Sequence, residues 1–97
     1  MAFSCGRGAR LPEDLSRAEG LLDSRPDSAL TILDSSSYSE TSGRYLYASY
    51  CLLRTFAEYN AYKPGIDEAM MNVGVDYFLK YGNRNRKAQA YYLRAVV

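Results

Sequence analysis

The chain has 97 residues, of which 47% are hydrophobic, so it can form at most one small domain with a limited core. Twelve Lys and Arg nearly balance eleven Asp and Glu, and the net charge of +1 provides no strong field to attract nucleic acid or an anionic membrane. Ten Tyr occur without any His or Trp. The lack of His removes the usual general base and the commonest metal ligand, which disfavours many kinds of catalysis.

Residues 1–10 are predicted to be a flexible tether, because residues 6–10 are rich in Gly and Arg. The preceding residues, MAFSCG, resemble the end of a bacterial lipoprotein signal peptide, in which a small residue precedes a Cys that becomes lipidated. Cys5 is therefore a lipidation candidate, and a free thiol on a disordered terminus is the other interpretation. No stretch reaches the ~18 apolar residues of a membrane span, so a lipid on Cys5 is the only membrane contact that we expect.

Two short helices are predicted next, over residues 12–24 and 26–34. In the first helix, Leu15 and Ala18 begin an apolar stripe at helical spacing. Pro26 stops this helix and opens the second one, because Pro is tolerated at the first helical position. Neither helix can bury its apolar face alone, so the two are expected to pack as a helical hairpin.

A third and longer helix is predicted over residues 41–60, with apolar or aromatic side chains around more than half of its girth. One face carries Tyr45, Ala48, Leu52, Phe56 and Tyr59. Cys51 lies among apolar neighbours and is expected to be a small buried residue, not half of a disulfide with Cys5.

The fourth helix is predicted over residues 67–81, where Asp67 and Glu68 follow a break at residues 63–65. Its apolar side is expected to hold Ile66, Met70, Val73 and Tyr77, with Phe78 nearby. Gly82 with Asn83 is expected to form the C-terminal cap. Gly74 costs ~1 kcal/mol relative to Ala inside a helix, so its presence predicts a close approach by a neighbouring helix.

The fifth helix is predicted from residue 84 to residue 97, with Ala88, Tyr92 and Ala95 on its apolar face. It ends at Val96 and Val97 without a polar cap, which indicates a segment truncated at its C-terminal end. An exposed apolar end of this kind predicts self-association through the C-terminal helix.

Helical periodicity by itself predicts only helical hairpins. A family is indicated by several short sequence motifs. These are RPDSAL at 25–30, ILD at 32–34, LYA at 46–48, VDYF at 75–78 and AQAYY at 88–92. Over residues 11–97 they resemble the N-terminal segment of exported, lipoprotein-type tetratricopeptide-repeat proteins of Bacteroides-like bacteria. The resemblance implies an all-α fold of about five antiparallel helices in helical hairpins, a tetratricopeptide-repeat-like right-handed solenoid segment. It also implies a periplasmic or membrane-anchored location and a role as a protein-binding scaffold or sensor arm.

The inner groove of stacked hairpins receives a peptide or a helix, which makes exposed tyrosines the candidate contacts. The candidates on the partner surface are Tyr45, Tyr47, Tyr59, Tyr62 and Tyr91. The alternative is that an aromatic stripe at helical spacing serves packing.

One local basic cluster offers a second kind of binding. It consists of Arg84, Arg86, Lys87 and Arg94, and three of these cations stand at a helix N-terminus, where they oppose the helix dipole. An acidic peptide, a phosphate or a nucleic-acid backbone would suit such a cluster. Without a net basic excess, a solvated face is the favoured interpretation and nucleic acid is the alternative partner.

The sequence predicts no catalytic, cofactor or metal site. Glu13, Asp14, Asp67 and Glu68 fit helix starts, where acids favour the dipole, and Asp76 is expected to lie in water. No Gly-rich phosphate loop and no spacing of Cys and His for a metal are present. We therefore expect a protein that binds other proteins or peptides and is not an enzyme.

Overall fold

The computed structural model describes residues 11–97, so the predicted tether and Cys5 lie outside the described residues. The elements in chain order are α1 (Glu13–Gly20), α2 (Pro26–Asp34), a short 3₁₀ turn η2 (Glu40–Ser42), α3 (Arg44–Asn60), α4 (Glu68–Tyr81) and α5 (Arg84–Val96). Within the described range there is no strand, and the predicted all-helical fold with five helices is confirmed.

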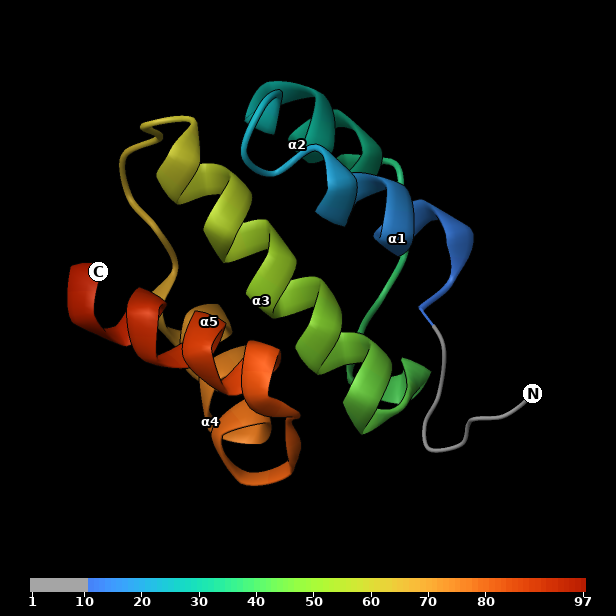
Figure 1. Cartoon of the computed structure of the whole chain (residues 1–97). Coiled ribbons are helices and arrows are strands. Elements are labelled where there is room, and N and C mark those ends of the chain that lie inside the picture. The colour runs from blue at the N-terminus through green and yellow to red at the C-terminus, as the bar shows by residue number, and fades with distance from the viewer. Residues whose placement is uncertain (1–10) are drawn as a thin grey trace.

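Helix α3 is the central element of the molecule. It contacts each of the other four α-helices, with α1 and α2 at one side of it and α4 and α5 at the other (Figure 1). In the same view, α1, α3 and α5 lie toward the viewer while α2 and α4 lie behind them (Figure 1). The sequence predicts apolar side chains around more than half of α3. These side chains therefore pack against α1 and α2 on one side and against α4 and α5 on the other.

Two clusters of buried side chains form the core, and α3 contributes to both. The first cluster joins α3 to α1 and α2 through Leu15, Ala18, Leu22, Ala29, Leu30, Leu33, Leu53 and Ala57. The second joins α3 to α4 and α5 through Ala48, Leu52, Met71, Val75, Phe78, Ala90 and Leu93. Cys51 is also buried and is free, as predicted, and burial raises the pKa of its thiol to about 11.

The close helix crossing that Gly74 predicts is present between α4 and α3. A Cβ atom at Gly74 would lie 2.8 Å from the backbone nitrogen of Leu52 and 3.0 Å from the carbonyl oxygen of Ala48. Because backbone atoms cannot move aside as a flexible side chain can, only Gly fits at this position.

The buried faces of α4 and α5 differ from those predicted. In α4 the core side is formed by Met71, Gly74, Val75 and Phe78, while Val73 is 39% exposed. In α5 it is formed by Ala90 and Leu93, while Ala88, Tyr92 and Ala95 are exposed. Both helices carry apolar or small residues on more than one side, and the buried side is selected by packing, of α4 mainly against α3 and of α5 mainly against α4.

Helix ends also differ from the prediction. Helix α3 begins at Arg44 instead of residue 41, because Glu40–Ser42 form the separate turn η2 and Gly43 has a φ of 107°. Helix α1 ends at Gly20 instead of continuing to residue 24. The next backbone amides bond to carbonyls three residues earlier instead of four, as when the Leu21 amide donates to the Ala18 carbonyl.

Gly82 is the C-cap of α4, as predicted, but Asn83 has another role. Its side chain accepts a hydrogen bond of 2.8 Å from the Arg86 amide and so begins α5.

Candidate functional site

Two grooves lie beside α4, one on each side of its C-terminal half. The large groove, of about 1200 Å³, lies among the end of α1, the start of α3, the end of α4 and the start of α5. It is lined by Glu19, Tyr45, Tyr77, Phe78, Tyr81, Gly82, Asn83, Asn85, Arg86, Ala88 and Gln89. The small groove, of about 380 Å³, lies between α3 and α4 and is lined by Glu40, Arg44, Tyr47, Ala48, Val73, Asp76, Tyr77, Lys80 and Tyr81.

Arg86 organises one wall of the large groove. Its guanidinium donates hydrogen bonds of 2.8 and 3.0 Å to the two carboxylate oxygens of Glu19, and a third of 2.8 Å to the side-chain oxygen of Gln89. It also lies 5.6 Å from the ring centroid of Phe78. With only 13% of its side chain exposed, Arg86 ties the start of α5 to the end of α1.

Aromatic side chains also line the large groove. The Tyr45 ring lies 6.2 Å from the Phe78 ring and 6.5 Å from the Tyr77 ring, between centroids, in tilted or edge-on arrangements. The lining of the groove therefore combines aromatic contact area with polar side chains, including Asn83 and Gln89.

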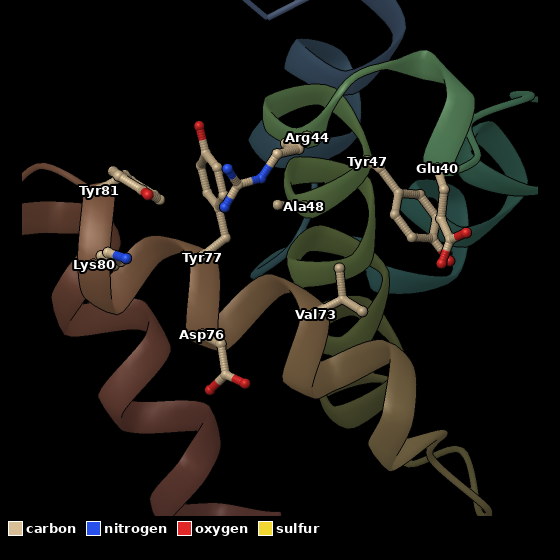
Figure 2. A pocket seen from close by; sticks show the side chains of 9 residues that line it. All are labelled: Glu40, Arg44, Tyr47, Ala48, Val73, Asp76, Tyr77, Lys80 and Tyr81. Atoms are coloured by element: carbon tan, nitrogen blue, oxygen red, sulfur yellow. The ribbon is translucent and has the colours of Figure 1, made fainter.

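The small groove carries a cluster of cations and aromatic rings at one end. The Arg44 guanidinium lies 5.7 Å from the centroid of the Tyr77 ring and 5.4 Å from that of Tyr81, and the Lys80 ammonium lies 5.3 Å from the same Tyr81 ring (Figure 2). Hydrogen bonding with Arg44, followed by Lys80, lowers the pKa of Tyr81. The other end holds Glu40 beside Tyr47, with Ala48 between the two ends (Figure 2).

The five predicted tyrosines do not gather on one surface. Tyr45 lines the large groove and Tyr47 the small one. Tyr59 packs edge-on against Tyr92 at 6.1 Å, toward the other end of α3. Tyr62 and Tyr91 are 93% and 65% exposed and line neither groove.

The predicted basic cluster is divided by ion pairs within the chain. Arg86 is bound to Glu19, and Arg94 donates a hydrogen bond of 2.7 Å to Asp76. Asp76 is exposed, as expected. Arg84 and Lys87 are exposed and form no ion pair with the residues that the structure describes.

Sequence reasoning missed four residues of the small groove: Arg44, Tyr77, Lys80 and Tyr81. The spacing of Tyr77 and Tyr81, one helical turn apart with Lys80 beside them, was a usable signal for a shared aromatic and cationic face. The sequence could not indicate that Arg44 lies near them, because Arg44 belongs to α3 and the contact depends on how α3 and α4 cross at Gly74.

No family model, curated protein or solved structure matches this chain. The resemblance to exported tetratricopeptide-repeat proteins therefore stays a prediction. Across residues 11–97, no helix combines the length and apolar character needed to cross a membrane. Within that same range, no three His, Cys, Asp or Glu side chains come together as a set of metal ligands.

Proposed function

We propose that this chain is a non-enzymatic protein-binding segment that holds a peptide or a helix in the large groove. We further propose that its helices form a right-handed solenoid of the tetratricopeptide-repeat type. The layered arrangement supports this, since α1, α3 and α5 would be the first helices of successive pairs (Figure 1). In such solenoids the first helices line the binding surface, and all three contribute to the large groove.

The observation that carries the proposal is the composition of the large groove. Tyr45 and Tyr77 supply partly exposed aromatic surface, while Asn83 and Gln89 contribute hydrogen-bonding groups to the same lining. Peptide recognition combines apolar contact area with a few polar groups that fix orientation. The groove has both, and its volume of about 1200 Å³ is large enough for several residues of a peptide.

A blocking substitution tests this function. Peptides selected from a random displayed library against the whole chain should bind stoichiometrically, and Ala88→Arg should weaken them about tenfold or more by filling the groove from an exposed position. The matched control is Ala69→Arg, at an exposed helical Ala that lines neither groove. Equal binding by the two variants would show that the selected peptides use another surface.

The alternative function, binding of nucleic acid or another acidic ligand through residues 84–94, has weaker support, because Arg86 and Arg94 already pair with acids. The two functions differ in salt dependence. Nucleic-acid binding would fall steeply with salt and would weaken on Arg84→Ala, whereas peptide binding in the large groove should change little in either experiment.

We also propose that the segment belongs to an exported bacterial protein, a periplasmic or membrane-anchored scaffold or sensor arm attached through a lipid on Cys5. The support is the MAFSCG motif at the start of the chain. Lipid on Cys5 would raise the measured mass of the protein purified from bacterial membranes, and Cys5→Ser would abolish both the added mass and the membrane fractionation. An unmodified Cys5 in the wild-type protein would reject the attachment.

A further inference from the structure

The small groove gathers two cations that no acid within residues 11–97 neutralises. Arg44 and Lys80 both lie within 5.4 Å of the Tyr81 ring centroid, and neither takes part in an ion pair of the described residues. Asp76 lines the same groove, but Arg94 engages it at 2.7 Å. Glu40 lies on the far side of Ala48 (Figure 2). The end around Tyr81 therefore carries uncompensated positive charge, which attracts an anion.

The space next to these cations is apolar. Ala48 is a buried residue of its lining, and Val73, also in the lining, is 39% exposed. The Tyr77 ring adds a flat apolar face (Figure 2). A volume of about 380 Å³ falls in the range of sites for small molecules and is too small for a folded partner.

We propose that the small groove binds a small organic carboxylate with an apolar body. The carboxylate lies among the Arg44 guanidinium, the Lys80 ammonium and the Tyr81 hydroxyl, all of which can donate hydrogen bonds to it. The body of the ligand covers Val73 and the Tyr77 ring. This site is additional to the proposed peptide function and does not depend on it. Tyr77 and Tyr81 line both grooves, but the site uses none of the residues that line only the large groove.

The test uses phenylacetate as the probe and the whole chain as the protein. In two-dimensional nitrogen–proton NMR spectra, phenylacetate should produce saturable shifts around Arg44, Lys80 and Tyr81, with a Kd of about 1 mM, as expected for a weak, partly exposed site. Arg44→Gln and Lys80→Gln should each raise the Kd about tenfold, since each removes a charge-assisted hydrogen bond. Lys87→Gln, at an exposed lysine of α5, should leave the Kd unchanged.

Two further ligands separate the parts of the proposal. Phenylacetamide has nearly the same shape without the charge, and acetate has the charge without the apolar body. Both should bind at least tenfold more weakly than phenylacetate. If phenylacetamide binds equally well, the cations play no part, and if acetate binds equally well, the apolar surface plays none. Either result overturns the proposal, as does the absence of saturable shifts with phenylacetate.

Discussion

Gly74 shows how much of this fold depends on one missing side chain. A Cβ atom there would lie 2.8 to 3.1 Å from backbone atoms of Leu52 and 3.0 Å from the Ala48 carbonyl oxygen, so α3 and α4 would have to separate. We expect Gly74→Ala to lower the free energy of unfolding by about 1–3 kcal/mol, although Ala favours a helix more than Gly does. Urea unfolding followed by circular dichroism measures the change.

Gly20 provides the control for this substitution. A Cβ atom at Gly20 would meet nothing within 4 Å, and the residue is exposed at the end of α1. Gly20→Ala should therefore leave the stability unchanged or raise it by up to about 1 kcal/mol. If both variants were equally stable, the close approach of α3 and α4 would not be the reason for Gly74.

At the same scale, Asp14 illustrates a role that the sequence did not predict. An acid in the first turn of α1 was expected to favour the helix dipole, but the carboxylate also accepts hydrogen bonds of 2.8 Å from Ser36 and 2.9 Å from Tyr38. Burial alone would raise the pKa of Asp14, but hydrogen bonds from Ser36, Tyr38 and the Leu15 amide outweigh burial and lower it.

A lowered pKa makes Asp14 a source of acid sensitivity. The unfolded chain takes up the proton more readily than the folded chain, so the stabilisation is complete above the unfolded pKa of about 3.9 and is lost as the pH falls through the lower, folded pKa. Asp14→Asn should therefore reduce the fall in unfolding free energy between about pH 5 and pH 3. Asp23→Asn, at an exposed acid outside this network, is the control; an equal effect of both variants would refute the assignment.

At the scale of the elements, the pair of Glu19 and Arg86 joins the first helix to the last. Its side chains are 35% and 13% exposed, and the contact is bidentate, so it should stabilise more than an ordinary surface ion pair. A double-mutant cycle with Glu19→Gln and Arg86→Gln should give a coupling free energy of about 1 kcal/mol in thermal or urea unfolding.

The pair of Asp76 and Arg94 serves for comparison, because its side chains are 69% and 48% exposed. Its coupling should stay below about 0.5 kcal/mol and should fall further with added salt. Equal coupling in the two pairs would mean that the partial burial of Arg86 adds nothing.

The sequence predicted the helices well but their orientation less well. All five helices were located, since Pro26, the acids at Asp67 and Glu68 and the cap at Gly82 act locally. The predicted buried side was wrong for α5 and, apart from Phe78, for α4. Aromatic and small residues occur around both helices, so the periodicity was compatible with more than one buried side. Contacts between distant residues, such as Glu19 with Arg86, depend on the packing of helices and leave no local pattern in the sequence.

The candidate site was predicted only in part, for the same reason. Of the candidate residues, Tyr45 and Arg86 line the large groove and Tyr47 lines the small one, whereas the remaining candidate tyrosines and cations line neither. Both grooves are formed by the crossing of α3 and α4, and Gly74 predicted this crossing without indicating which side chains would flank it.

At the scale of the whole molecule, the end of α5 presents apolar side chains to solvent. Tyr91, Val96 and Val97 are 65%, 37% and 39% exposed. Such a surface favours weak association between copies of the chain, so the sedimentation coefficient should rise with protein concentration. The double variant Tyr91→Lys with Val96→Lys should remain monomeric, whereas Ala69→Lys should behave as the wild type. Concentration-independent sedimentation of the wild type would reject self-association.

The position of α3 between the two clusters has a consequence for hydrogen exchange. Leu52 faces one cluster and Leu53 the other, so opening either half of the molecule still leaves the middle of α3 covered by the other half. Amide protons there should exchange with deuterium only when the entire chain unfolds, and their protection should equal the global free energy of unfolding. The ends of α1 and α5 should exchange much earlier, through openings that leave the centre intact.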